Sequence, residues 1–232
     1  DENGCNVTSN DFIFAYPPEI TIDSEASTPL TCNGIDDGTI TVSASGGTGT
    51  LTYELNPGAI TNTTGIFTGV GPGTYTVDVT DDNACGPVIS SPFTLAYPAA
   101  IIIDSESFLP LRCFGIDDAS ISVSASGGTG TLTYTLNPGA ISNATGNFTS
   151  LGPGNYTVTV TDDNGCFVVS NVFNLAYPPQ LVIDGEASSP INCNGIDDGT
   201  ITVSASGGTG TLTYTLNPGA IASNTTGIFT GV

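Results

Sequence analysis

The sequence predicts an all-β protein built from tandem immunoglobulin-like or fibronectin-III-like β-sandwich repeats of about 80 residues. Three observations support this class. A segment that begins Cys-Asn-Gly-Ile-Asp-Asp-Gly at Cys32 returns with small changes at Cys113 and at Cys193. Within each period, short stretches alternate apolar and polar residues between turns rich in Gly, Pro and Asn. No stretch shows the 3.6-residue periodicity of an amphipathic helix.

This period divides the chain into segments. We predict the end of a preceding repeat with its last strand (1–17), two complete immunoglobulin-like repeats (18–97 and 98–177) and a truncated repeat (178–232). The third repeat is truncated because no equivalent of 71–80 follows Val232. Two explanations stay open: the chain is a window on a longer array, or a neighbouring chain supplies the missing strand.

The strands of the first complete repeat follow from its alternating stretches. They are predicted at 19–23, 39–45, 51–55, 65–70, 75–79 and 88–95, and the segment 59–64 is predicted to be a surface loop or an edge strand. Ile40, Val42 and Ala44 recur at every second position, so they are predicted to face the core. Ser27-Thr28-Pro29 is predicted to interrupt the first strand. Asn33–Gly38 has the composition of a turn, since Asn, Asp and Gly tolerate left-handed backbone.

The segment Phe67–Tyr75 resembles the corner between the fifth and sixth strands of immunoglobulin-like domains. In those domains a tyrosine at the start of the sixth strand donates a hydrogen bond back to the backbone. We therefore predict that Tyr75 and Tyr156 are structural residues of such tyrosine corners.

The cysteines occupy two fixed positions in each period. The chain has no His, and its Cys residues are not clustered as a zinc site requires. Regular Cys pairs in a β-rich chain predict disulfides formed in an oxidising compartment. In one sandwich, Cys32 and Cys85 would lie about a strand length apart, roughly 20 Å, whereas a disulfide joins Cα atoms about 4.4–6.8 Å apart.

Head-to-tail stacking of repeats would instead bring Cys32 to Cys166. We favour this pair, with the other cysteines paired equivalently to neighbouring repeats (Cys5, Cys85, Cys113 and Cys193). Two alternatives stay open. Cys32 pairs with Cys85 if the strand order differs, and Cys85 pairs with Cys113 if the intervening Tyr-Pro stretch is a hairpin.

The charge balance excludes several function classes. The formal net charge is −21, with Arg112 as the single basic residue. Binding to nucleic acid or to anionic lipid needs several Lys or Arg, so neither partner is expected. No apolar run approaches the ~18–20 residues that insertion into a membrane requires. The chain has no His or Lys, and its paired aspartates recur in every copy, so it is not expected to be an enzyme.

The remaining candidate ligands are carboxylates. Near the proposed junction of repeats, Asp36, Asp37, Asp162, Asp163 and Asn164 could together offer oxygen atoms to calcium. Paired aspartates in turns more commonly accept hydrogen bonds from their own backbone, and no loop fits the spaced EF-hand pattern. Calcium is therefore a weak expectation, and no other cofactor is expected.

Two longer segments resemble a known family. They are Cys-Asn-Gly-Ile-Asp-Asp-Gly-Thr-Ile-Thr-Val-Ser-Ala-Ser-Gly-Gly from Cys32 and Gly-Pro-Gly-Thr-Tyr-Thr-Val-Asp-Val-Thr-Asp-Asp-Asn-Ala-Cys up to Cys85. Both are similar to the SprB-type repeat of very large bacterial surface adhesins. The resemblance implies export to the cell surface, arrays of many units, and roles in surface attachment and gliding. No adhesive tip or anchor region accompanies the repeats, so the resemblance favours a stalk.

Three functions are compatible with these observations. The first is a rigid extracellular rod or filament segment, reinforced by disulfides, whose partners are neighbouring repeats of the same or identical chains. The second is a multivalent module that binds surface glycans through exposed threonine rows such as Thr39 and Thr41. The third is a filament subunit that assembles by strand donation between chains.

Overall fold

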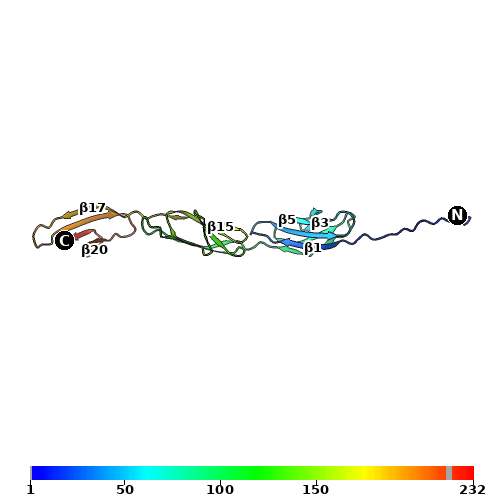
Figure 1. The fold of residues 1–232 in the computed structure, drawn as a ribbon, viewed down its shortest axis with the longest axis horizontal. Helices are drawn as coiled ribbons and strands as arrows, with labels where there is room; N and C mark the ends of the chain where they lie inside the picture. Colours follow the sequence, from blue (N-terminus) through cyan, green and yellow to red (C-terminus); the bar gives the residue numbers. More distant parts are fainter. Residues whose placement is uncertain (1, 218–220) are drawn as a thin grey trace. The chain divides into compact units, whose positions relative to one another are not determined.

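Residues 2–217 and 221–232 are described by the computed structural model (Figure 1). Each regular element within these ranges is a β-strand, and the chain divides into two compact units, 1–100 and 101–232. The prediction of an all-β chain is confirmed, whereas the finer predicted bounds of the repeats stay predictions. The described ranges contain no helix that could span a bilayer.

The first unit folds as two antiparallel sheets that face each other. Its strands are β1 (Thr21–Thr28), β2 (Gly38–Ser45), β3 (Thr52–Asn56), β4 (Ile60–Asn62), β5 (Ile66–Val70), β6 (Gly73–Thr80), β7 (Val88–Ile89) and β8 (Phe93–Leu95). One sheet has the order β1-β2-β5, and the other has the order β4-β3-β6-β7, with β8 also paired to β6. This division of strands between two sheets is that of an immunoglobulin-like sandwich.

The core lies between the sheets, where inward side chains recur at every second position. Ile40 pairs with Phe67 across β2 and β5, and Leu55 pairs with Val77 across β3 and β6. All four side chains are buried in a single cluster that also includes the apolar residues of β8. The alternation in the sequence therefore predicted the inward face correctly.

Two strands differ from the prediction. The interruption predicted at Ser27-Thr28 is wrong, because β1 continues to Thr28, which pairs with Thr39, and ends before Pro29. The strand predicted at 88–95 is divided into β7 and β8 around Ser90. The buried Ser90 hydroxyl accepts a hydrogen bond from the Val77 nitrogen at 2.8 Å, so the side chain replaces a regular ladder contact.

The second unit repeats this plan once in full. The complete sandwich is formed by β9 (Ile102–Leu109), β10 (Ala119–Ser126), β11 (Thr133–Asn137), β12 (Ile141–Asn143), β13 (Asn147–Leu151), β14 (Gly154–Thr161), β15 (Phe167–Val169) and β16 (Phe173–Leu175). Its sheets have the orders β13-β10-β9 and β12-β11-β14-β15, with β16 paired to β14. Ile121, Leu136 and Val158 are fully buried, as are their equivalents in the first unit.

The remainder of this unit is an incomplete sandwich. It contains β17 (Val182–Ser189), β18 (Thr200–Ser206), β19 (Tyr214–Leu216), β20 (Ile221–Asn224) and β21 (Ile228–Thr230). The sheet β17-β18-β21 corresponds to the first sheet of the complete repeats, but the opposing sheet consists of β19 and β20. Within the described residues nothing corresponds to β14 or β16, which cover the core of the preceding sandwich.

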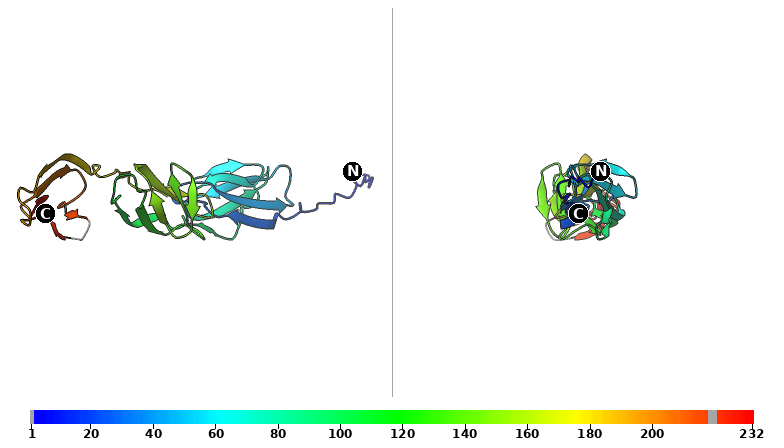
Figure 2. Two further views of the ribbon diagram at one scale, coloured as in Figure 1. Left: turned by 60° about the vertical axis from the view of Figure 1, so that its left-hand side comes forward. Right: turned by 90° about the vertical axis from the view of Figure 1, so that its right-hand side faces the viewer.

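Residues 2–20 precede the first strand. They contain no strand, although 1–17 is predicted to include one, and they are drawn as a coil in both ribbon views (Figures 1 and 2). The physical reason is the absence of a partner strand: β8 is held by β6 and β16 by β14, and the described residues offer no such strand to this segment. The large apolar side chains of residues 7–16 are consequently exposed, whereas Ile20 is already part of the core.

Candidate functional site

The turn between the first two strands of each repeat is closed by an aspartate. Asp37 accepts a hydrogen bond from the Thr31 backbone nitrogen at 3.0 Å and another from the Thr31 hydroxyl. These bonds, the hydroxyl contributing most, hold the pKa of the Asp37 carboxyl below its ordinary value. In the third repeat Asp198 accepts from the Asn192 nitrogen at 2.9 Å. The aspartate therefore fixes the turn that carries the first cysteine of each period.

The aspartate just before it attaches the end of each complete repeat to the same turn. The Tyr97 hydroxyl donates to Asp36 Oδ1 at 2.5 Å, and the Tyr177 hydroxyl donates to Asp117 Oδ1. Because the carboxylate favours the protonated phenol, these hydrogen bonds raise the pKa of both tyrosines. The Tyr-Pro stretch at the end of a repeat is thus anchored to that repeat's first turn.

The hairpin that carries the second cysteine is organised by a buried aspartate. Asp81 accepts hydrogen bonds from the backbone nitrogens of Thr48 at 2.9 Å, Asn83 at 3.0 Å and Cys85 at 2.8 Å. The bond from Cys85 contributes most to lowering the pKa of the Asp81 carboxyl. Asp162 has the same three kinds of contact in the second unit. One carboxylate thus joins the hairpin to the glycine-rich turn beside it.

Four of the predicted calcium ligands, Asp36, Asp37, Asp162 and Asp163, already accept hydrogen bonds from the protein. Asp36 and Asp37 accept bonds in the first turn, and Asp162 and Asp163 accept bonds from backbone amides near the hairpin, the last from Thr131 at 3.1 Å. Within each unit, no three His, Cys, Asp or Glu side chains of the described residues are grouped as a metal site requires. Hydrogen bonds occupy lone pairs that a cation would need. Calcium binding stays a prediction.

The cysteines differ in their chemical state. Cys32 and Cys166 are disulfide-bonded. Cys85, Cys113 and Cys193 are exposed thiols. The two oxidised residues belong to the pair favoured from the sequence, while the connectivity of all six cysteines stays a prediction.

The two corner tyrosines lie half-buried beside the core. The Tyr75 hydroxyl donates to the Gly71 carbonyl oxygen at 3.3 Å, and the Tyr156 hydroxyl donates to the Gly152 carbonyl oxygen at 3.3 Å. A Cβ atom added at Gly73 would lie 3.0 Å from the Tyr75 ring, so the ring packs closely against the backbone at this position. These contacts support a packing role for both tyrosines.

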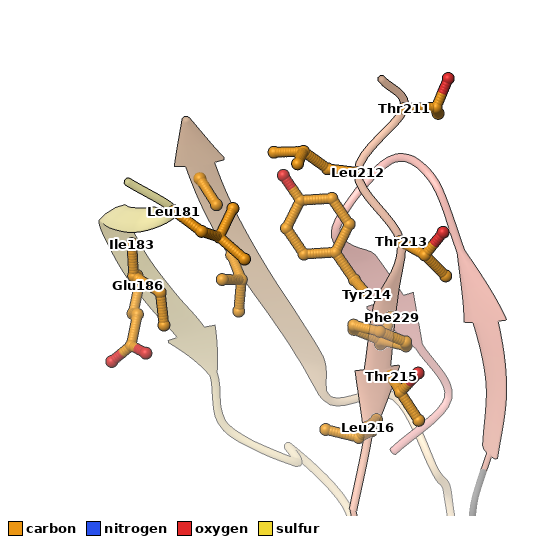
Figure 3. Close-up of a pocket in the computed structure, with 12 residues that line it drawn as sticks. Leu181, Ile183, Glu186, Thr211, Leu212, Thr213, Tyr214, Thr215, Leu216 and Phe229 are labelled. Carbon is orange, nitrogen blue, oxygen red and sulfur yellow. The ribbon is translucent and has the colours of Figure 1, made fainter. Parts of the chain in front are cut away.

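The sequence reasoning did not predict an open apolar groove that lies in the third repeat. It encloses about 520 Å³ between the sheet β17-β18-β21 and the segment 211–216, which includes β19. The apolar side chains of its walls point toward one another, whereas Thr213 and Thr215 point away (Figure 3). The principal lining residues are Leu181, Ile183, Val203, Leu212, Tyr214 and Phe229. The missing equivalent of 71–80 was the available signal, since the corresponding strands β6 and β14 cover these positions in complete repeats.

Comparison with solved structures gives low similarities. The C-terminal 282-residue fragment of intimin, solved with the intimin-binding domain of the translocated intimin receptor, is 18% identical with a TM-score of 0.38, over 73% of this chain and 67% of that one. Immunoglobulin domains 1–5 of Sidekick-1 are 11% identical with a TM-score of 0.37, over 84% and 46%. Extracellular domains 3–5 of Drosophila OTK are 14% identical with a TM-score of 0.28, over 82% and 77%. The fold assignment therefore depends on the chain's own strand order.

Comparison with protein families is more specific. No curated protein matches the chain. The family model of the SprB repeat matches 24–60, 105–141 and 185–221, so it recurs once in each period. Each match begins within the first strand of a repeat and includes the turn with the first cysteine, which Asp37, Asp118 or Asp198 closes. The chain is an SprB-type repeat protein.

Proposed function

We propose that this chain is a structural segment of an extracellular surface adhesin, a stiff stalk or filament whose repeats are joined covalently by disulfides. In this proposal Cys32 pairs with Cys166, and the junction between consecutive repeats is crosslinked. The observation that carries the proposal is the disulfide-bonded state of these two cysteines in an SprB-type repeat array. Disulfides persist in oxidising compartments, which supports a location outside the cell.

The local anchors support the same role. The Tyr97–Asp36 bond fastens the end of the first repeat to its own turn, next to Cys32. The hairpin that carries Cys166 is fixed by Asp162, which accepts a bond from the Cys166 nitrogen at 2.9 Å. Both proposed partners therefore sit on short, hydrogen-bonded segments. Fixing such segments in advance lowers the conformational entropy that a crosslink must remove.

Force spectroscopy tests the crosslink directly. Cys32 and Cys166 are 134 positions apart, and an extended chain spans about 3.3–3.6 Å per residue. A bond between them would withhold roughly 450 Å of extension from a stretched chain until a reductant is added. The Cys32→Ser variant should release this length without reductant. The Cys113→Ser variant changes an exposed thiol and should behave as the original chain.

Non-reducing peptide mapping gives an independent result. The proposal requires a crosslinked peptide that contains Cys32 and Cys166, and the original chain should lose it only after reduction. A peptide that joins Cys32 to Cys85 would contradict the proposal, as would an extension that is equal with and without reductant.

A further inference from the structure

The first turn of the first repeat contains an Asn-Gly pair, Asn33-Gly34, and both residues are exposed. The Ile35 nitrogen donates a hydrogen bond to the Cys32 carbonyl oxygen at 3.3 Å, and the φ angle of Gly34 is 80°. A positive φ at the third position is that of a type II turn, where glycine is favoured. The turn therefore places the Asn33 side chain directly before the peptide nitrogen of an exposed glycine.

This peptide nitrogen is unprotected. Among the described residues, the Gly34 nitrogen has no hydrogen-bond acceptor. A Cβ atom added at Gly34 would meet no described atom within 4 Å, so no neighbouring group crowds the position. Because glycine has no side chain of its own, the nitrogen is open to solvent and can lose its proton to hydroxide.

The Asn33 amide has a structural role in the same repeat. Its Nδ2 donates a hydrogen bond to the Pro98 carbonyl oxygen at 3.1 Å. The neighbouring Tyr97 hydroxyl donates to Asp36 Oδ1 at 2.5 Å. The end of the first repeat is therefore anchored to the first turn by two hydrogen bonds, one of which needs the amide of Asn33.

We propose that Asn33 is a self-modifying site, at which slow deamidation releases the Pro98 anchor of the first repeat. The deprotonated Gly34 nitrogen attacks Cγ of Asn33, a C–N bond forms, and the bond from Cγ to Nδ2 breaks so that ammonia leaves. Water then adds to one of the two carbonyl carbons of the five-membered succinimide. The ring opens to aspartate or to isoaspartate, and no oxidant or reductant takes part.

Both products remove the anchor. A carboxylate at position 33 has no proton to donate to the Pro98 carbonyl oxygen, and its charge repels that oxygen. The new charge also lies on the same turn as Asp36 and Asp37. Isoaspartate in addition lengthens the backbone of the turn by one carbon atom. The Tyr97–Asp36 bond is then the remaining hydrogen bond of this anchor.

The fold selects between two Asn-Gly pairs of the same composition. In the hairpin at Asn164, the Gly165 nitrogen donates to the Asp162 carbonyl oxygen at 3.0 Å. This hydrogen bond must break before the nitrogen can attack, so Asn164 should react about tenfold more slowly than Asn33. Asn194-Gly195 has the turn of Asn33, with the Ile196 nitrogen 3.3 Å from the Cys193 carbonyl oxygen, and should react as well.

The second repeat makes its anchor without an amide. Phe114 is the equivalent of Asn33, and its ring centroid lies 5.3 Å from that of Tyr177. An aromatic contact cannot deamidate. The modification therefore loosens the anchor of the first repeat and leaves that of the second repeat unchanged.

Incubation of the full chain in water labelled with heavy oxygen, followed by peptide mass spectrometry, tests the reaction. The peptide that contains Asn33 should take up one labelled oxygen, faster in mild alkali than at neutral pH, because the attacking nitrogen must be deprotonated. Isoaspartyl methyltransferase should label the isoaspartate product. The peptide that contains Asn164 should take up the label about tenfold more slowly.

Short synthetic peptides with the sequences around Asn33 and Asn164 are the matched control, since they lack the fold and should react at similar rates. If Asn33 stays intact in the folded chain while its synthetic peptide converts, the proposal is overturned. Equal rates at Asn33 and Asn164 in the folded chain would overturn it too, because the hydrogen bond of Gly165 would then offer no protection.

Calorimetry tests the release of the anchor separately. Asn33→Asp should lower the Tm of the first repeat by about 2–12 °C without incubation, as expected for one lost hydrogen bond, while the second repeat keeps its Tm. Asn33→Gln keeps an amide that closes a less favourable six-membered ring, so this variant should take up no label over the same time. An unchanged first transition in Asn33→Asp would overturn the role of Asn33 as an anchor, and rapid labelling of Asn33→Gln would overturn the succinimide route.

Discussion

Removing one leucine from the core should have very different effects in the complete and the incomplete repeat. Leu55 is 2% exposed in the first repeat, whereas its equivalent Leu216 lines the open groove of the third. Leu55→Ala deletes three buried carbon groups, about 2.4 kcal/mol of transfer free energy at about 0.8 kcal/mol each. The cavity that remains raises the expected cost to about 2–5 kcal/mol. Leu216→Ala should cost about 1 kcal/mol or less, since water already reaches the groove.

Differential scanning calorimetry can measure this contrast in one chain. For a domain of this size, 1 kcal/mol corresponds to about 4–8 °C in Tm. Leu55→Ala should therefore move the transition of the first repeat about 8–40 °C lower, while the transition of the second repeat stays in place. Leu136→Ala should do the same to the second repeat, because Leu136 is equally buried. Equal shifts for Leu55→Ala and Leu216→Ala would refute the assignment of a closed and an open core.

Three further outcomes are expected. Gly34→Ala should cost about 1–2 kcal/mol for its left-handed backbone, and Gly65→Ala should cost more in the same calorimetric assay, because its Cβ would lie 2.0 Å from the Val42 carbonyl oxygen. The pKa of Asp81 is lowered, so its contribution to stability is complete above its ordinary pKa of 3.8 and is lost as the pH falls through the lower folded-state value. In Asp81→Asn, the midpoint of urea unfolding should therefore lose the part of its decrease in acid that Asp81 causes. The raised pKa of Tyr97 means that its contribution is complete below pH 10.0 and is lost as the pH rises through the folded-state value; Tyr97→Phe should be less stable than the original chain at neutral pH and should converge with it in alkali.

The core faces could be predicted from the sequence because they follow from a local rule. In a strand, residues two apart share a face, so the apolar set that contains Ile40 and Val42 had to point the same way. Near-identical copies then extended the prediction to Ile121 and Val123, which are also buried. The class of fold followed from seven short alternating strands with turns between them, whereas the order of strands in each sheet came from the structure.

The ends of strands depended on contacts that the sequence does not reveal. Ser90 interrupts the last strand because its hydroxyl meets the Val77 nitrogen, and a serine by itself gives no sign of such a partner. The continuation of β1 to Thr28 depends on the paired hydroxyls of Thr28 and Thr39, 2.7 Å apart across the strands. In both cases a hydrogen bond between residues distant in the sequence determined where the strand ends, against the prediction from the local sequence pattern.

The candidate sites, like the strands, could be predicted from the sequence only in part. The sequence identified the aspartates of both turns, but their hydrogen-bond partners, such as the Thr48 nitrogen for Asp81, come from neighbouring loops. It also identified the missing strand of the third repeat. It could not show that Glu106 and Asp117 accept hydrogen bonds from Asn171 and Tyr177, because these contacts form only in a folded repeat.

The scarcity of positive charge determines how the exposed sheet faces are stabilised. Arg112 is the single basic residue, so ion pairs cannot stabilise the sheets throughout the chain. The described residues contain one ion pair, in which Arg112 and Asp118 lie 3.9 Å apart. Paired hydroxyls take this place between β1 and β2, where Ser24 and Ser43 lie 2.7 Å apart. Such cross-strand pairs contribute about 0.2–1 kcal/mol each and carry no charge that salt could screen. A surface stabilised in this way keeps its internal contacts over a wide range of ionic strength, while its acidic residues keep neighbouring molecules apart.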